Sequence, residues 1–164
     1  MSEKVVIELP PTVCQQIDKW VEKYPADKKQ SAVLSALMIV QEHNGGWLTR
    51  ELIDAVADYL SMPRIAAYEV ATFYSMFDLK PAGKYKIGLC TNISCVLGGC
   101  DDIANHLKQR LQIDFGETTK DGRFTLRSVE CLGACIEAPV MHLNKQYHEK
   151  LTPEKVDKIL DGLK

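Results

Sequence analysis

The sequence lacks most of the features that mark common function classes. It has no run of basic residues, and its net charge of −2 gives no electrostatic reason to expect nucleic-acid binding. Its longest apolar stretch, residues 32–40, is interrupted by Ser35 and is much shorter than the roughly 20 residues that cross a membrane. Glycine-rich nucleotide-binding motifs, a Ser/His/Asp arrangement and internal repeats are also missing. We therefore expect no nucleic-acid partner, no direct membrane insertion and no nucleotide held by this chain alone.

The N-terminal residues do not have the composition of a targeting segment. Glu3 and Glu8 lie where a signal peptide has a basic region followed by an apolar one. We therefore expect a cytoplasmic protein, and the cytoplasm is a reducing compartment. The chain has 6 cysteines, and in that compartment they argue against a disulfide framework and in favour of metal or redox chemistry.

The first 80 residues have the periodicity of helices. Asp27 and Gln30 match a capping box before a helix at residues 31–43. Thr49 is expected to cap a third helix, and Pro63 to lie in the first turn of a fourth. Short loops between these helices predict an antiparallel bundle. The apolar positions along them are Val13, Ile17, Trp20, Val21 and Tyr24 in the first helix, Leu52, Ile53, Val56, Ala57 and Leu60 in the third, and Ile65, Tyr68, Phe73 and Met76 in the fourth.

The pattern changes at the linker Lys80-Pro81-Ala82-Gly83. After it, strands and helices alternate, as in an α/β layered domain resembling thioredoxin. We predict an α+β chain in two parts, with a helical bundle at residues 1–80 and a thioredoxin-like α/β domain at residues 81–164. The expected strands are residues 84–90, 124–129 and 139–143 with a short fourth strand after them, and the expected helices are residues 101–111 and a last helix capped by Thr152.

Four of the cysteines form two pairs, and each pair begins where a predicted strand ends. Four residues separate Cys90 from Cys95, and three separate Cys131 from Cys135. If the two strands are parallel, both loops leave the sheet at the same edge. Each iron of a [2Fe–2S] cluster is tetrahedral and takes two thiolates, so one local pair per iron satisfies the geometry. The pattern therefore favours one [2Fe–2S] cluster.

The residues around these cysteines suit such a site. Small residues let the backbone approach cluster sulfur, where N–H groups donate hydrogen bonds. Glu130 and Glu137 lie beside expected ligands, and we expect their negative charge to hold the reduction potential low. The small residues are Gly98, Gly99, Gly133 and Ala134, and an apolar shell that excludes water is expected from Ile93, Val96, Leu97, Leu132 and Ile136.

Other kinds of site fit the cysteines less well. Both spacings lie within the range of structural zinc sites with four cysteine ligands, so a zinc-stabilised interaction module stays open. A [4Fe–4S] cluster usually has a run of closely spaced cysteines, and a thioredoxin-type enzyme needs two cysteines separated by two residues; neither pattern occurs. Cys100 is expected as a buried thiol on the first turn of the following helix, although its position lets it compete as a ligand. Cys14 is expected to serve packing.

The cysteine motifs resemble those of the thioredoxin-like [2Fe–2S] subunits of respiratory complex I, the NADH:quinone oxidoreductase. The resemblance covers essentially the whole chain and includes two further segments. The matching stretches are residues 90–95 (CTNISC), 130–135 (ECLGAC), 71–75 (ATFYS) and 121–126 (DGRFTL).

This resemblance implies that Cys90, Cys95, Cys131 and Cys135 are the cluster ligands. It implies that the cluster exchanges single electrons with the FMN of a partner flavoprotein, which also binds NADH. The helical bundle would help to dock onto that partner among the further subunits of a complex on the cytoplasmic side of the inner membrane. The chain would not be catalytic alone. Related subunits serve NAD-dependent hydrogenases and formate dehydrogenases, so these parent complexes stay open.

Overall fold

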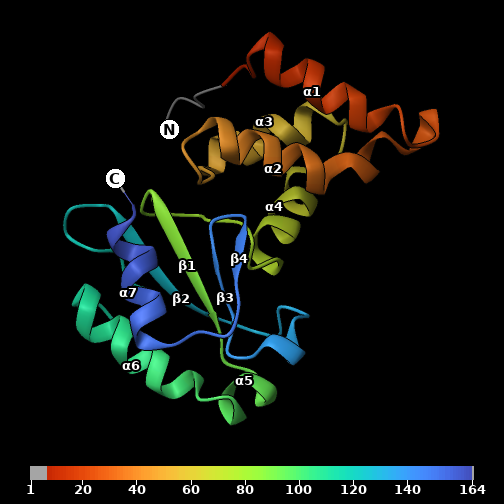
Figure 1. Ribbon diagram of the computed structural model, residues 1–164. Helices are drawn as coiled ribbons and strands as arrows, with labels where there is room; N and C mark the ends of the chain where they lie inside the picture. Colours follow the sequence, from red (N-terminus) through yellow and green to blue (C-terminus); the bar gives the residue numbers. More distant parts are fainter. Residues whose placement is uncertain (1–6, 164) are drawn as a thin grey trace. The chain divides into compact units, whose positions relative to one another are not determined.

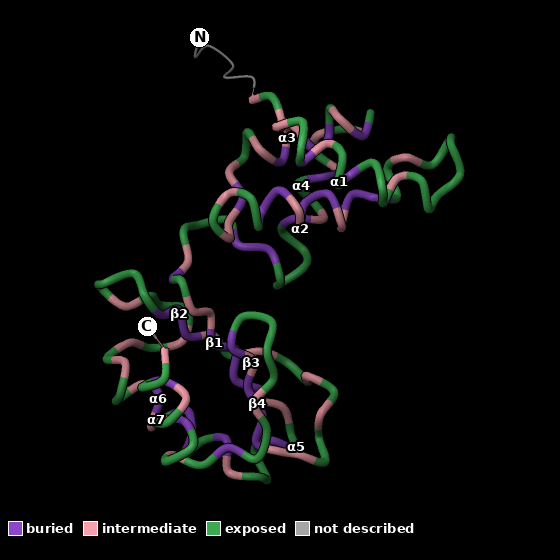
Figure 2. The backbone as a smooth tube through the Cα atoms, turned by 45° about the horizontal axis from the view of Figure 1, so that its top comes forward, coloured by how far each residue is buried: buried purple, intermediate pink, exposed green. Residues whose placement is uncertain are grey.

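The computed structural model describes residues 7–163, so Glu3 lies outside the described part. The chain divides into two compact units, Met1–Pro81 and Ala82–Lys164 (Figure 1). Each unit has its own group of buried residues (Figure 2). Within the described residues, no helix is long and apolar enough to cross a membrane.

The first unit consists of helices packed around an aliphatic core. α3 packs against both α2 and α4, and α1 packs against α2. The core is formed by side chains such as Ile17, Leu37, Ile53 and Val56, all of which are fully buried. The elements are α1 (Pro11–Val21), the 3-10 helix η1 (Ala26–Ala32), α2 (Val33–His43), α3 (Arg50–Tyr59) and α4 (Arg64–Phe73).

The helix starts agree only in part with the sequence analysis. Thr49 caps α3 as predicted, because its hydroxyl oxygen accepts a hydrogen bond from the Leu52 N–H at 3.2 Å. The predicted capping box is wrong. Asp27 lies in the 3-10 helix, and α2 begins at Val33 without a side-chain cap. Pro63 occupies the N-cap of α4 and so precedes its first turn.

The buried face of α4 differs from the apolar pattern of its sequence. Ala67 and Ala71 face the core, whereas Ile65 is 66% exposed and Phe73 is 80% exposed. Small side chains let a helix approach its neighbour closely, so the alanines pack inward and the large residues stay at the surface. In α1, Val13 and Ile17 are buried while Trp20 is exposed, and Tyr24 lies beyond the end of the helix.

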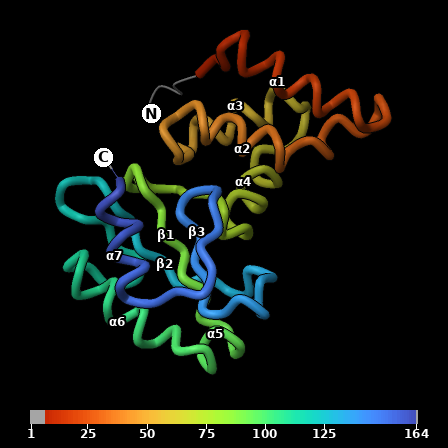
Figure 3. Tube along the Cα trace, in the orientation of Figure 1, coloured from red at the N-terminus to blue at the C-terminus, as the bar shows by residue number. Residues whose placement is uncertain are grey.

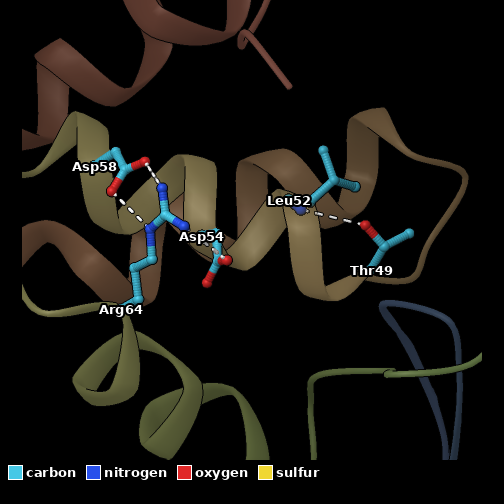
Figure 4. A network of polar contacts seen from close by, with 5 residues as sticks. All are labelled: Thr49, Leu52, Asp54, Asp58 and Arg64. Carbon is cyan, nitrogen blue, oxygen red and sulfur yellow. Dashed lines mark hydrogen bonds and ion pairs between the residues drawn. The ribbon is translucent and has the colours of Figure 1, made fainter. Parts of the chain in front are cut away.

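Arg64 fixes the turn between α3 and α4. Its guanidinium donates to Asp58 through Nε–Oδ1 at 3.0 Å and Nη2–Oδ2 at 2.5 Å, and to Asp54 Oδ2 at 3.2 Å (Figure 4). The planar fork of arginine suits this bidentate contact with a carboxylate. The two carboxylates raise the pKa of Arg64, mainly through the hydrogen bond with Asp58. α4 is therefore tied to α3 at its first residue.

The second unit is a four-stranded mixed sheet in the order β2-β1-β3-β4. β1 pairs parallel with β2 and antiparallel with β3, and β3 pairs antiparallel with β4. α6 and α7 cover one face of this sheet (Figure 3). The strands are β1 (Tyr85–Cys90), β2 (Phe124–Val129), β3 (Met141–Leu143) and β4 (Gln146–His148), and the helices are α5 (Ile93–Leu97), α6 (Cys100–Leu111), the 3-10 helix η2 (Cys135–Glu137) and α7 (Pro153–Asp161).

β1 shows why the sheet takes this register. Ile87 and Leu89 point to the helix-covered face and are fully buried, as the alternation predicts. Gly88 faces the other side, where a Cβ atom would lie 2.1 Å from Nε2 of His142 on β3. Glycine therefore leaves room for the histidine ring. Thr152 caps α7 as predicted by accepting a hydrogen bond from the Lys155 N–H at 3.2 Å.

The packing of the first unit predicts a sharp contrast between two isoleucines. Ile53→Ala opens a cavity in a fully buried position and is expected to cost about 2–5 kcal/mol in the free energy of unfolding. Ile65→Ala removes a side chain that is mostly in solvent and serves as the matched control, with an expected change within about 0.5 kcal/mol. Urea unfolding followed by circular dichroism measures both. Similar costs for the two variants would contradict this assignment of the core.

Candidate metal centre

The parallel pairing of β1 and β2 brings the two cysteine segments to one edge of the sheet. The register pairs Cys90 with Val129, and the N–H of Thr91 donates to the carbonyl of Val129 at 3.0 Å. Cys131 follows two residues after Val129. The two strands are therefore parallel, which is the condition under which both cysteine segments leave the sheet at the same edge. The carboxyl ends of parallel strands are a common location for binding sites.

Cys90 and Cys95 form the buried half of the site. Both are 2% exposed and pack with Cys100 and Val140. The five-residue helix α5, which the sequence analysis missed, carries Cys95. Burial, followed by the hydrogen bond with the Cys90 thiol, raises the pKa of Cys95 to about 11. These two thiols therefore contact each other inside a small buried cluster.

Cys131 and Cys135 form the exposed half of the site. Their Sγ atoms are 3.5 Å apart, and both residues are exposed. Gly133, at a φ of +77°, turns its N–H toward Cys131 Sγ at 3.4 Å. This N–H and the Cys135 thiol lower the pKa of Cys131. The thiolate, which is the form that binds metals, is thereby favoured at Cys131.

Side chains join the two halves. Asn92 Nδ2 donates to Glu130 Oε2 at 2.8 Å, and the hydroxyls of Thr91 and Ser128 are 2.7 Å apart. Leu132 and Ala134, from the second cysteine segment, pack against the buried thiols. The hydroxyl of Tyr147 on β4 donates to the carbonyl of Leu132 at 3.2 Å. Neighbouring elements therefore hold both segments in place.

The cysteines are arranged as two pairs. Among residues 7–163, no group of three or more His, Cys, Asp or Glu side chains is close enough to hold one metal ion. A [2Fe–2S] cluster takes four cysteines in total and two at each iron, so a donor set of two local pairs fits its chemistry. The two pairs lie on segments that follow neighbouring strands, and the Gly133 N–H is directed at the sulfur of Cys131. Both features suit a [2Fe–2S] cluster.

The remaining cysteines lie outside the two pairs. Cys100 is fully buried at the first position of α6, as predicted, and burial followed by the charge of Asp101 raises its pKa. It neighbours Cys90, but its thiol is directed to Asp101 Oδ1 at 3.9 Å. Cys14 belongs to the helical unit, where its thiol donates to the Leu9 carbonyl at 3.6 Å.

The expected apolar shell is wrong in all but one position. Leu132 is partly buried against the cysteines, but the other four residues project into solvent, with Leu97 85% exposed and Ile136 95% exposed. They lie in α5 and η2, which have five and three residues and are too short to bury a long apolar face. These exposed side chains form an apolar rim around the site, which consists of Ile93, Val96, Leu97 and Ile136.

The two glutamates beside the cysteines have different partners. Glu130 accepts the hydrogen bond from Asn92, which is a neutral group. Glu137 forms an ion pair with Lys150 Nζ at 2.6 Å, and its backbone carbonyl also accepts from the Lys150 N–H at 2.7 Å. The charge of Glu137 is therefore compensated locally.

Sequence reasoning did not identify the residues that connect the cysteine segments. Asn92 caps α5 by accepting from the Ile93 N–H at 2.9 Å, and it contacts Glu130 at the same time. Partners 38 positions apart leave no periodic pattern in one sequence. A cavity of about 1110 Å³ is lined by the end of α6, residues 117–121 and the end of α7, and none of the cysteines lines it.

Comparison with known proteins shows the family of the chain. The chain matches the family of thioredoxin-like [2Fe–2S] ferredoxins over residues 17–164. The E subunit of NADH-quinone oxidoreductase from Rickettsia bellii is 51% identical over 144 residues, which are 88% of this chain and 86% of that protein. NADH dehydrogenase [ubiquinone] flavoprotein 2, mitochondrial, of Dictyostelium discoideum is 40% identical over 149 residues, 91% of this chain and 60% of that protein.

Solved structures that are similar to this chain share only about a fifth of its residues, so they inform on its fold alone. A chain of an NAD⁺-reducing [NiFe]-hydrogenase in the air-oxidized state has a TM-score of 0.69 and 22% identity, and the match covers 82% of this chain and 23% of that one. Together with the family match, this confirms the predicted fold class, a helical bundle followed by a thioredoxin-like domain. The chain therefore belongs to the family of thioredoxin-like [2Fe–2S] ferredoxins and, within it, to the E subunits of NADH-quinone oxidoreductases.

Proposed function

We propose that this chain holds one [2Fe–2S] cluster through Cys90, Cys95, Cys131 and Cys135, as the electron-transfer subunit of an NADH:quinone oxidoreductase. The observation that carries the proposal is the placement of two thiol pairs at the adjacent ends of parallel strands β1 and β2. When bound, the cluster accepts and returns one electron at a time. The protein supplies the ligands and their surroundings.

The two thiol pairs have different tasks in this proposal. Cys90 and Cys95 anchor the site in a small buried cluster beside the main core, where Val140 and Leu132 exclude water. Cys131 and Cys135 lie at the surface and give electrons a short path to an outside partner. Gly133 donates its N–H toward the sulfur of Cys131 and stabilises negative charge there. The exposed pair therefore faces the partner, and the buried pair holds the site in the protein.

The electron partner is the FMN of a flavoprotein, which also binds NADH. The apolar rim, which lies on α5 beside Cys95 and on η2 beside Cys135, suits contact with such a protein, because exposed apolar groups of this kind mark interaction surfaces. The helical unit at residues 1–80 contributes a second docking surface, on which Ile65, Tyr68 and Phe73 of α4 are exposed. Further subunits complete a complex at the cytoplasmic side of the inner membrane, with this chain as a peripheral member.

Two alternative functions make different predictions. A place in an NAD-dependent hydrogenase or formate dehydrogenase is compatible with the fold. The identity of 51% to a subunit of NADH-quinone oxidoreductase favours the quinone oxidoreductase instead. A zinc-stabilised interaction module would use the same thiols as a colourless site. The colour and metal content of the purified chain separate iron from zinc.

The proposed function predicts a red-brown protein with two irons and two sulfides per chain. Its EPR signal is expected only after reduction with dithionite, and iron and sulfide assays measure the stoichiometry.

Serine in place of Cys90, Cys95, Cys131 or Cys135 is expected to reduce cluster content strongly, whereas Cys14→Ser serves as the control and leaves it unchanged. The chain alone should not oxidise NADH. A colourless zinc protein, or NADH oxidation without a flavoprotein, would contradict the proposal.

Removing the cluster is expected to destabilise the unit at residues 82–164. The unit is small, and its site is formed by loops that need their ligand. We expect a loss of at least about 2 kcal/mol, which corresponds to a fall in Tm of about 8–16 °C for a unit of this size. Anaerobic calorimetry of the full chain, before and after chelation of iron, measures the change. Unchanged melting of the cluster-free chain would argue against coupling between cluster binding and folding.

The two glutamates beside the ligands are expected to affect the reduction potential unequally. Glu130→Gln removes a charge whose hydrogen-bond partner, Asn92, is neutral, so the potential is expected to rise by on the order of tens of millivolts. Glu137→Gln is expected to raise it less, because Lys150 already offsets that charge. Potentiometric titration followed by EPR measures both variants. A potential that stays unchanged in Glu130→Gln would show that its charge has no influence.

A further inference from the structure

The side chain of Asn92 contacts both cysteine segments at once. Its Oδ1 accepts from the Ile93 N–H at 2.9 Å and so caps α5, the helix that carries Cys95. Its Nδ2 donates to Glu130 Oε2 at 2.8 Å. One amide group therefore orients the helix of the first segment and bonds to the second segment.

The position of this contact along the chain is significant. Asn92 lies two residues after Cys90 and three before Cys95, and Glu130 directly precedes Cys131. In the described part of the chain, the last backbone hydrogen bond between these two segments joins Thr91 to Val129. Beyond that bond, the polar contact between the segments passes through side chains. Beyond the strands, the contact between Asn92 and Glu130 therefore links the two cysteine segments directly.

We propose that Asn92 and Glu130 form an interloop clasp that sets the spacing of the two thiol pairs and thereby determines how firmly the chain retains its cluster. The inference rests on the ligands assigned in the proposed function. Asn92 and Glu130 are positioning residues, because they act through the cysteines and do not bind iron. The bond between Thr91 and Ser128, at 2.7 Å, supports the clasp from the strand side.

The clasp differs from two simpler roles of the same residues. If Asn92 served only as a helix cap, any residue with a capping oxygen would replace it. If Glu130 served only as a charge, glutamine and alanine would be equivalent there. Glutamine keeps an oxygen that accepts the hydrogen bond from Asn92, whereas alanine does not. Variants at these two positions therefore separate the clasp from capping and from charge.

The test measures iron release from the full chain, purified anaerobically with its cluster, after addition of a ferrous chelator. Asn92→Asp keeps the cap but replaces the donor with a carboxylate facing Glu130, and we expect about fivefold faster release. Glu130→Ala is expected to behave similarly. Glu130→Gln is expected to release iron at nearly the rate of the unmodified chain. The double variant Asn92→Asp/Glu130→Gln restores a hydrogen bond with donor and acceptor exchanged, and we expect it to recover slow release.

The outcomes separate this proposal from the one on which it rests. A double variant that loses iron as fast as Asn92→Asp, or equal rates for Glu130→Ala and Glu130→Gln, would overturn the clasp while leaving the cluster assignment intact. An unmodified chain without iron and sulfide would overturn the assignment itself. The width of the EPR signal in the reduced state is a second readout, and it is expected to broaden in Asn92→Asp and to return in the double variant.

Discussion

The parallel pairing of β1 with β2 is the constraint on which the second unit depends. Parallel neighbours need a long crossover, and here the crossover carries α5 and α6 between the two strands. Because both strands run in the same direction, Cys90 and Cys131 leave the sheet at one edge. β3 then pairs with the free side of β1, and the Val140 carbonyl, just before it, accepts from the Cys90 N–H at 3.0 Å. The geometry of the site thus follows from strand direction.

The same arrangement explains why the two thiol pairs are unequal. The segment after β1 is buried at the cysteines, because Cys95 and Cys100 pack with Val140. The segment after β2 stays at the surface, and its 3-10 helix η2 begins at Cys135. Thiols that are buried on one side and exposed on the other suit the [2Fe–2S] centre proposed above, which must be both stable and accessible to a partner. The contacts of Asn92 and Tyr147 connect the exposed side to neighbouring elements.

The sequence predicted correctly those features that depend on neighbouring residues or on a simple spacing. Alternation in β1 and the caps Thr49 and Thr152 were predicted correctly, since each depends on neighbours within a few residues. It failed at α5, which is too short to show periodicity, and at the start of α2, where residues 26–32 form a 3-10 helix instead. The assignment of the four cysteines as ligands remains a prediction supported by their two paired positions.

The two largest errors of the sequence analysis have one cause. The predicted apolar face of α4 and the predicted apolar shell of the site both presuppose that a chain buries its own large apolar residues. Ile65 and Phe73 of α4 are nevertheless exposed, and so are Leu97 and Ile136 of the apolar rim. Exposed apolar groups are unfavourable in water, and their area is expected to be covered by another protein when it serves a function. A subunit of a larger complex divides its apolar residues between its own core and its interfaces. For such a chain, departures from the rule that apolar residues lie inside indicate where its partners bind.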